Sequence, residues 1–231
     1  MNLLRKNNGL FPVFFLLLFT GCASYYPQVV DIPLIKEKGD TRINAGFFIV
    51  PSPYDDDINV GGHGTFSRGI TDFLSVQTYA SFDGLFRFHL QGALGVFKGF
   101  ENNAVIELYA GYGYGTGSLF GIIAMDNYQI TFAQFNIGKI NQNNSKIDYG
   151  LGLKGGYVYN DYKYYNENYT YLNIESKYGW MAEPSVFIRV GGNRVKYNLT
   201  VNYLWLEHIA EGYYFPVSIG MGVNIRLGNK K

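Results

Sequence analysis

Cysteine is almost absent from this chain of 231 residues: Cys22 stands alone, so a disulfide bond within the chain is excluded. Charged residues are also scarce. They make up 16% of the chain and leave a net charge of +1, which gives no basic face of the kind that nucleic-acid binding needs. Disorder is not expected, because disordered chains combine low hydrophobicity with high net charge, whereas 47% of these residues are hydrophobic.

Glycine and aromatic residues are abundant instead. The chain contains 29 Gly, 21 Tyr and 18 Phe, and the Gly content is well above the usual value of roughly 7%. Small residues combined with Tyr and Phe suit crowded, curved strands and the aromatic belts of membrane interfaces. No break in composition divides the chain, which predicts a single domain of ordinary size.

Residues 1–21 are predicted to be a signal peptide. Arg5 and Lys6 form a basic start, and the apolar run at 10–19 is too short to span a bilayer as a helix. The sequence Phe-Thr-Gly-Cys that ends at Cys22 resembles the lipobox of bacterial lipoproteins, although Phe19 stands where Leu is commonest. That resemblance implies cleavage before Cys22 and addition of a diacylglycerol with acyl chains such as palmitate. The alternative is an ordinary signal peptide with an incidental Cys.

Residues 22–40 are predicted to be a lipidated N-terminus and linker, ahead of a β-barrel domain at 41–231. Pro27 and Pro33 interrupt any regular element in this segment. Its length is sufficient to tether an anchor at Cys22 to a folded body.

The rest of the chain alternates between apolar and polar residues, in runs separated by Gly, Asn and Asp. The runs are long enough for tilted transmembrane strands, which need about 9–11 residues, whereas strands of soluble proteins average about 5–6. We therefore predict an all-β fold, an antiparallel up-and-down transmembrane β-barrel of about ten strands. The strands are predicted at 41–50, 58–68, 73–82, 85–96, 104–115, 128–139, 147–159, 178–190, 194–206 and 215–227.

The alternation separates a large apolar face from a small or polar one. In the last strand, large apolar residues at 217, 219, 221, 223, 225 and 227 alternate with Ser, Gly, Asn and Arg. A membrane barrel has large apolar residues on its outer face and small or polar residues on its inner face, and a soluble barrel has the reverse arrangement. In the sixth strand, Ile130 and Phe132 are out of phase with Phe135 and Ile137, which predicts a β-bulge near Ala133.

Connection lengths and aromatic residues favour one orientation. With the N-terminus in the periplasm, the periplasmic connections at 69–72, 98–103, 141–146 and 191–193 are all short. The outer connections are longer, except for Asp83-Gly84, which predicts a tight hairpin. Aromatic residues near the outer strand ends predict an interfacial girdle. These residues are Phe82, Tyr112, Tyr114, Tyr128, Tyr157, Tyr159, Tyr178, Trp180, Tyr203, Trp205 and Phe215.

Three segments carry a family resemblance: IPLIKEKGD at 32–40, RGITDFLSV at 68–76 and ELYAGYGYGTG at 107–117. They resemble the small outer-membrane β-barrel proteins of Gram-negative bacteria, several of which follow a lipobox. The resemblance covers residues 25–231 and implies the barrel fold and a location in the cell outer membrane. It implies no activity, because these motifs are turn and strand patterns.

The polar faces predict a charged lumen. The candidate lining residues are Arg42, His63, Arg87, His89, Glu107, Asp148, Lys154, Glu183, Arg189, Lys196 and Arg226. One interpretation is that these charges pair across a narrow interior and fill it. The other is a narrow porin-like channel with a weak anion preference, since six of these residues are basic and three are acidic.

No motif predicts catalysis, a cofactor or a metal site. His208, with Glu207 and Glu211 nearby, is interpreted as part of a solvated loop, and Asp55-Asp56-Asp57 as an acidic turn rather than a calcium site. The loop predicted at 160–177 is rich in Tyr and Asn, side chains that make adaptable contacts in binding loops. It is the best candidate for a surface that binds a partner.

Three functions remain open from the sequence. The first is a non-enzymatic barrel in outer-membrane lipid, either a narrow pore or a closed structural barrel. The second is an adhesin or a subunit of a complex that acts through residues 160–177. The third is a soluble, lipid-anchored, lipocalin-like barrel that binds a hydrophobic ligand, which requires the apolar faces to point inward. The sequence does not indicate an oligomeric state.

Overall fold

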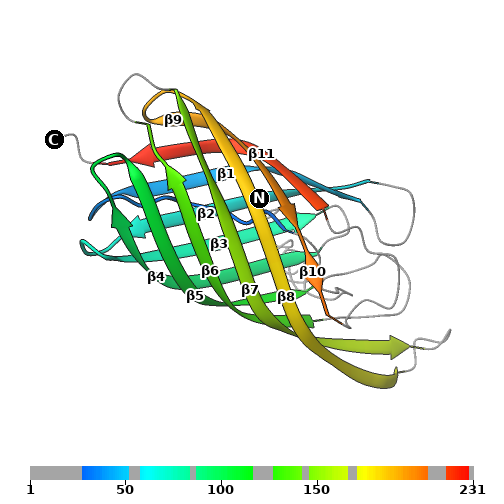
Figure 1. Cartoon of the computed structure of the whole chain (residues 1–231). Helices are drawn as coiled ribbons and strands as arrows, with labels where there is room; N and C mark the ends of the chain where they lie inside the picture. The colour runs from blue at the N-terminus through cyan, green and yellow to red at the C-terminus, as the bar shows by residue number, and fades with distance from the viewer. Residues whose placement is uncertain are drawn as a thin grey trace, which may run out of the picture.

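A computed structural model describes residues 28–51, 58–83, 87–116, 127–141, 146–165, 171–207 and 217–228. Within these ranges the chain forms eleven β-strands and no helix, and the strands make one closed sheet (Figure 1). No helix in these ranges is long and apolar enough to cross a membrane. The predictions about Cys22, Asp55-Asp56-Asp57, His208, Glu211 and Phe215 fall outside the described residues.

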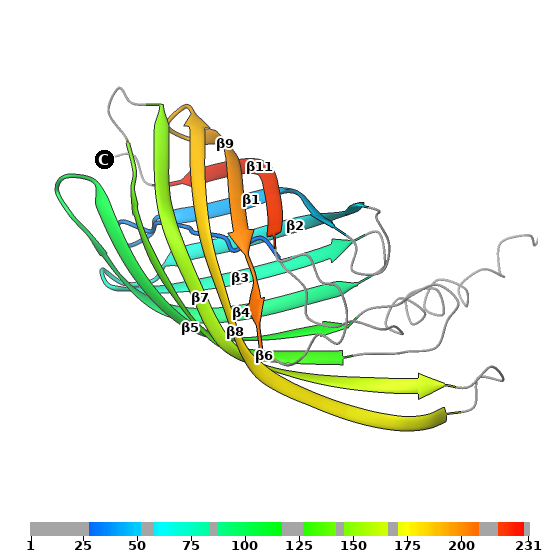
Figure 2. The same ribbon diagram turned by 45° about the vertical axis from the view of Figure 1, so that its right-hand side comes forward.

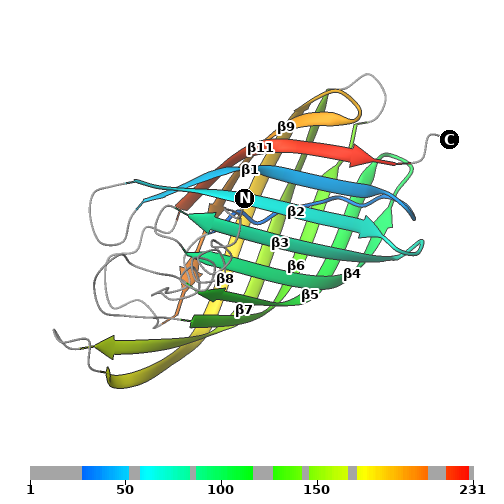
Figure 3. The same ribbon diagram turned by 180° about the vertical axis from the view of Figure 1, so that it is seen from behind.

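The strands follow one another around the barrel in chain order. Their bounds are β1 (Thr41–Pro51), β2 (Ile58–Gly69), β3 (Leu74–Asp83), β4 (Phe88–Gly99), β5 (Ala104–Thr116), β6 (Asn127–Lys139), β7 (Ile147–Tyr165), β8 (Tyr171–Gly191), β9 (Val195–Tyr203), β10 (Trp205–Leu206) and β11 (Val217–Leu227). All pairings are antiparallel, and β1 pairs with both β2 and β11, which closes the barrel (Figure 3). Both β9 and β10 pair with β8 in one continuous register, so they are two parts of one strand. The predicted antiparallel up-and-down barrel of ten strands is therefore confirmed.

The two ends of the barrel differ in their connections. At one end the strands are joined by residues 70–73, 100–103, 140–146 and 192–194, and we call this the short-turn end. The opposite end, where β1 finishes at Pro51 and β2 begins at Ile58, is called the long-loop end. The chain reaches the short-turn end again at Leu227, where β11 finishes.

The outward face of the barrel is apolar and the inward face is polar. In β9, odd-numbered residues such as Tyr197 and Leu199 are exposed, whereas the even-numbered Lys196 and Asn198 are buried. Exposure of large apolar side chains is high around the barrel, reaching 70% for Leu94. A soluble protein rarely exposes so extensive an apolar surface, because contact with water would cost free energy over its whole area.

Outward-facing aromatic residues lie near both ends of the barrel. Those near the long-loop end are Phe82, Tyr112, Tyr114, Tyr157, Tyr178, Trp180, Tyr203 and Trp205, as predicted, with Tyr159 half-buried, and those near the short-turn end are Phe66, Phe73, Phe100, Tyr149 and Tyr197. On β7 the two sets are separated by the eight residue steps from Tyr149 to Tyr157, about 27 Å along a strand. With a strand tilt of about 35–45°, this spacing is roughly 20 Å along the barrel axis, close to the height of the apolar band of membrane barrels.

Two predictions about β6 are wrong. The pairing of β6 with β5 and β7 continues without a shift through Ala133, so there is no β-bulge. Ile130, Phe132 and Tyr128 all point into the barrel, and Tyr128 therefore does not belong to the outer girdle. These side chains pack in a buried apolar cluster with Val158, Met181, Leu204 and Leu206. The inward face is thus apolar toward the long-loop end, whereas the sequence analysis assumed a polar interior along the whole barrel.

Two predicted connections also differ. Phe82 pairs with Phe88, so the β3–β4 hairpin is not a two-residue Asp83-Gly84 turn. The Asp83 carboxylate accepts hydrogen bonds from the Arg87 backbone N–H at 3.1 Å and its guanidinium at 2.6 Å, which closes a wider connection. The segment predicted as a loop at 160–177 is mostly β-structure, because β7 extends to Tyr165 and β8 begins at Tyr171.

Candidate functional site

The interior of the barrel is occupied by the chain itself. Residues 28–35, which we call the luminal segment, precede β1 and are buried throughout, with Leu34 and Ile35 completely shielded from solvent. The segment is not paired with any strand. Figure 2 shows it as the dark blue trace that crosses the inside of the barrel. Because it lacks a strand partner, its buried backbone groups need hydrogen bonds from side chains of the wall.

Three wall residues hold the segment near the long-loop end. The Gln28 side chain donates a hydrogen bond to the Tyr128 hydroxyl at 2.8 Å, and the Gln28 carbonyl accepts one from Ser218 at 3.1 Å. The backbone N–H of Val30 donates to the Asn202 side chain at 3.2 Å. These contacts come from β6, β11 and β9, so the segment is held from different sides of the barrel.

Asp31 is the centre of the polar contacts in the middle of the lumen. Its carboxylate accepts a hydrogen bond from Asn44 at 2.8 Å and lies 3.5 Å from the Arg189 guanidinium. Its backbone carbonyl accepts hydrogen bonds from the side-chain amides of Gln77, at 3.1 Å, and Gln134, at 2.8 Å. Four strands therefore converge on one residue of the luminal segment.

Glu107 holds the last part of the segment. Its carboxylate accepts the Ile35 backbone N–H at 2.6 Å and is also bonded to Asn136 and Tyr109. Beyond the segment, Asp40 lies at the short-turn end, where it binds the Arg226 guanidinium through both carboxylate oxygens at 2.9 and 3.1 Å. The chain therefore descends from the long-loop end to the short-turn end before β1 begins.

Glycines on the inward face make room for apolar side chains of the luminal segment. A methyl group added at Gly220 would lie 2.6 Å from the Val29 side chain, and one at Gly152 would lie 2.7 Å from Ile32. At Gly138 it would lie 2.7 Å from Leu34. Because these distances are far below van der Waals contact, the wall and the segment fit each other closely. This fit explains part of the high glycine content of the inward strand faces.

All eleven candidate lumen residues have side chains on the inward face, and Arg226 is the most exposed of them. The structure adds three acidic residues to the interior, namely Asp31, Asp40 and Asp83. Asp31 and Asp40 precede the first strand, and Asp83 was assigned to a turn, so alternation within strands gave no signal for them. With these three, the six basic residues face six acidic ones, and the basic excess behind the predicted anion preference is removed.

The remaining interior charges form ion pairs within the wall. Lys196 lies 2.5 Å from Asp148, Arg87 lies 2.5 Å from Asp83, and Lys154 lies 3.6 Å from Glu183. The Lys154–Glu183 pair links the neighbouring strands β7 and β8, and the Arg87–Asp83 pair closes the β3–β4 hairpin. The Lys196–Asp148 pair joins β9 to β7 across the intervening β8. These pairs support the interpretation in which charges pair across the interior and fill it.

The two interior histidines belong to a row of rings on the wall. His63 stacks on Tyr79 with ring centroids 6.2 Å apart, and His89 stacks on Tyr128 at 5.4 Å. Tyr128 is also hydrogen-bonded to His89 Nδ1 at 2.8 Å. In the part of the chain that the structure describes, no three His, Cys, Asp or Glu residues are arranged to hold a metal ion.

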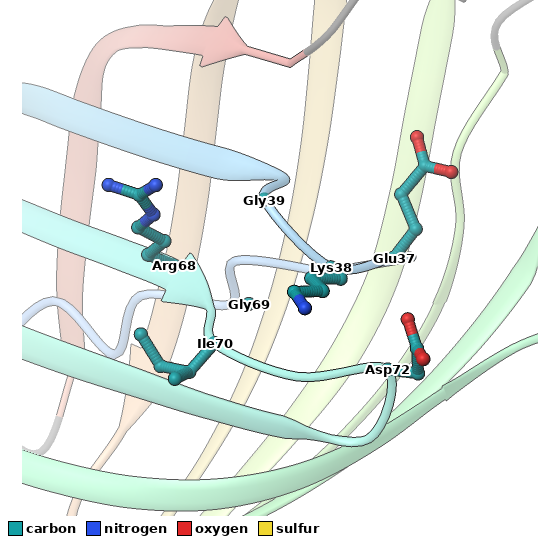
Figure 4. A pocket seen from close by; sticks show the side chains of 7 residues that line it. All are labelled: Glu37, Lys38, Gly39, Arg68, Gly69, Ile70 and Asp72. Carbon is teal, nitrogen blue, oxygen red and sulfur yellow. The ribbon is translucent and has the colours of Figure 1, made fainter.

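A hollow of about 600 Å³ lies at the short-turn end, where the chain leaves the lumen to enter β1 (Figure 4). It is lined by Glu37, Lys38, Gly39, Arg68, Gly69, Ile70 and Asp72. Two acidic and two basic side chains are mixed in this lining, so it favours neither anions nor cations. None of the predicted site residues lies in it.

Removal of the Asp31 carboxylate should weaken the packing of the luminal segment. We expect Asp31→Ala to lower the free energy of unfolding by about 3 kcal/mol, because Arg189 loses a buried ionic partner. Urea denaturation of the protein folded in lipid measures this change. The control is Glu37→Ala, which removes an exposed carboxylate a few residues away and should change the free energy by less than about 0.5 kcal/mol. Equal effects of the two substitutions would contradict the described role of Asp31.

Together, the closed sheet, the apolar outer face and the polar interior define a β-barrel of the membrane type. No family model and no curated protein matches the chain. Among solved structures it is similar to the outer membrane protein OprG from Pseudomonas aeruginosa, with 14% identity, a TM-score of 0.45, and coverage of 86% of this chain and all of that one.

Two further solved structures are similar. The attachment invasion locus protein Ail of Yersinia pestis shows 12% identity and a TM-score of 0.38, over 83% of this chain and all of that one. The N-terminal β-barrel domain of Pseudomonas aeruginosa OprF shows 11% identity and a TM-score of 0.29, with the same coverage. Because these TM-scores are below 0.5, the architecture of this chain is derived from its own strand pairing.

Proposed function

We propose that this protein is a non-enzymatic outer-membrane β-barrel whose lumen is closed by its own N-terminal segment. It acts as a structural barrel in the membrane rather than as an open pore. The observation that carries the proposal is the luminal segment, whose backbone and side chains are bonded to seven strands of the wall.

The outer face supports insertion into lipid. Its central band is mainly aliphatic, with Leu153 and Val201 among the exposed residues and Phe135 paired with Leu153, and further aromatic residues border it toward both ends. Among the described residues, every strand except the two-residue β10 pairs with two neighbours, so these strands leave no unpaired backbone edge for lipid to contact along the closed part of the barrel. A lipocalin-like soluble barrel requires apolar faces that point inward, and the burial pattern is the opposite.

The interior opposes conduction of ions. An extended peptide fills the axis of the lumen, and the charges around it are balanced and paired. A pore would need water along its axis and a net charge to select ions. We therefore favour a closed barrel over the narrow porin-like channel.

We also propose that residues 1–21 are removed on export and that Cys22 carries the lipid anchor implied by the lipobox resemblance. Such an anchor would add a second attachment to the membrane. Mass spectrometry of the mature chain tests this: an N-terminal Cys22 with added acyl mass supports it, and a chain that begins elsewhere without that mass contradicts it.

A second candidate function is partner recognition through the β7–β8 hairpin. Strand β6 pairs with β7 only up to Asp161, and residues 162–165 pair only with 171–175 in the described part of the chain. This two-stranded hairpin projects beyond the rest of the barrel (Figure 1). An exposed strand edge can accept a strand of another protein. Deletion of residues 162–174 should abolish such binding and leave the barrel folded.

The proposed function is tested with the isolated outer-membrane fraction. A folded membrane barrel should be present in that fraction and should migrate differently on a detergent gel before and after boiling. In planar bilayers, the purified full-length protein should insert without producing conductance steps. Absence from the outer membrane together with no heat shift would contradict a membrane barrel, and regular steps from the intact chain would contradict closure.

A further inference from the structure

The direction of the luminal segment has a consequence for membrane topology. We propose that the mature N-terminus lies on the same side of the membrane as the long-loop end, and is therefore displayed at the cell surface. This inference rests on the proposed function as an outer-membrane barrel. It replaces the expectation, made from connection lengths, that the N-terminus lies in the periplasm.

The contacts of the luminal segment follow one order along the barrel axis. Gln28 is bonded to Tyr128 and Ser218, which are the second residues of β6 and β11, and both of these strands begin at the long-loop end. Asp31 is bonded to Gln134, the eighth of the 13 residues of β6, and Ile35 is bonded to Glu107, the fourth residue of β5, which begins at the short-turn end. The chain thus passes through the lumen once, from the long-loop end to the short-turn end.

The residues that follow the luminal segment fix it at the short-turn end. The Gly39 N–H donates to the Gly69 carbonyl at 2.9 Å, and Asp40 binds Arg226. Lys36 also reaches Asn103 at 2.8 Å. Because both ends of the segment are held by different strands, the segment cannot run in the other direction without loss of all these contacts.

Only a short stretch of chain separates the luminal segment from the predicted start of the mature chain. Six residue steps separate Cys22 from Gln28, and an extended chain spans at most about 22 Å over that length. A return through the filled lumen to the opposite side is sterically excluded, and the length is too short to pass around a barrel of this size. The mature N-terminus must therefore stay on the long-loop side.

The orientation of the barrel in the membrane determines whether the long-loop end faces the periplasm or the cell exterior. The C-terminal strand ends at Leu227 at the short-turn end, together with the four short connections. Outer-membrane barrels place short turns in the periplasm and longer loops outside. An acyl group on Cys22 would therefore have to enter the outer leaflet, so this protein would be anchored from the cell surface.

The test uses single cysteines and a membrane-impermeant maleimide on intact cells, in the full-length chain. Tyr25→Cys reports the N-terminal side, Gly228→Cys reports the short-turn end, and Glu167→Cys reports the hairpin between β7 and β8. The parent chain measures any labelling of Cys22, which is subtracted. We expect Tyr25→Cys and Glu167→Cys to label equally in intact and lysed cells, and Gly228→Cys to label only after lysis.

The outcomes separate this inference from the proposed function. If Glu167→Cys labels in intact cells but Tyr25→Cys labels only after lysis, the inference is overturned and the outer-membrane barrel stands. If Gly228→Cys alone labels in intact cells, the orientation is reversed and the inference is overturned. If no variant labels and none shows a heat shift, the outer-membrane barrel itself is overturned. A heat shift of each variant shows that the substituted chain has folded.

Discussion

Deletion of residues 28–35 is expected to turn a silent barrel into a conducting one. The luminal segment runs through the lumen from Gln28 to Ile35 and is buried throughout, and its removal leaves many polar and charged side chains of the wall without a filling peptide. Single-channel recording in planar bilayers measures the change: regular conductance steps for the deletion variant and none for the parent chain. Ion selectivity should be weak, since six basic residues then face five acidic ones.

The matched control for this deletion removes residues 166–170 at the tip of the β7–β8 hairpin, which lie outside the lumen-filling segment. This variant should remain silent. Both variants must retain the heat shift, which shows that the barrel has closed. A folded deletion variant that stays silent would mean that another part of the chain blocks the lumen, and the closure assigned to residues 28–35 would be wrong.

The second large effect is expected on the outer face. Leu153→Arg and Val201→Arg each place a charge in the middle of the aliphatic band, where Leu153 is 50% exposed and Val201 is 37% exposed. An arginine at the bilayer midplane costs about 2–4 kcal/mol, because a charged group must leave water or distort the lipid. Each substitution should lower the free energy of unfolding in lipid vesicles by that amount.

Ile70→Arg is the control for the substitutions Leu153→Arg and Val201→Arg. Ile70 is also exposed, at 48%, but it lies in a connection at the short-turn end, where water and lipid headgroups can solvate a charge. It should change the free energy of unfolding by about 0–1 kcal/mol. If arginine at 153 and 201 costs no more than arginine at 70, the apolar face does not contact lipid and the membrane barrel is contradicted.

The strands could be predicted from the sequence because apolar and polar residues alternate within each of them. A strand with lipid on one side and a crowded lumen on the other must alternate, and β9 and β11 do so over their whole length. The strand bounds depend only on local alternation and on turn residues. Local information was therefore sufficient for the barrel, its strand number and the inward position of the eleven candidate lumen residues.

The luminal segment could not be predicted in the same way. Its partners lie far away in the sequence: Asp31 is bonded to Gln134, and Ile32 to Arg189. No alternation marks it, since it is surrounded by wall on all sides, and Pro33 suggested a linker. The misplaced phase of β6 has the same origin, because Ile130 and Phe132 pack inside the barrel against residues far away in the sequence, such as Met181 and Leu204.

Two residues that precede β1 affected the prediction of function, because they were left out of the count of lumen charges. Asp31 and Asp40 were assigned to a linker, yet both lie inside the barrel beside Arg189 and Arg42. Without them the lumen appeared basic, which favoured an anion channel. A count of charge in a lumen therefore requires every segment that enters it, including segments outside the strands.

Amide hydrogen exchange of the full-length protein in lipid, followed by mass spectrometry of the peptide that contains residues 28–35, tests the central claim most directly. The amides of Val30 and Ile35 are bonded to Asn202 and Glu107 in the interior, so we predict exchange as slow as that of the barrel strands. Exchange as fast as that of an unstructured peptide would contradict the claim, because the lumen would then not be filled by the N-terminal segment.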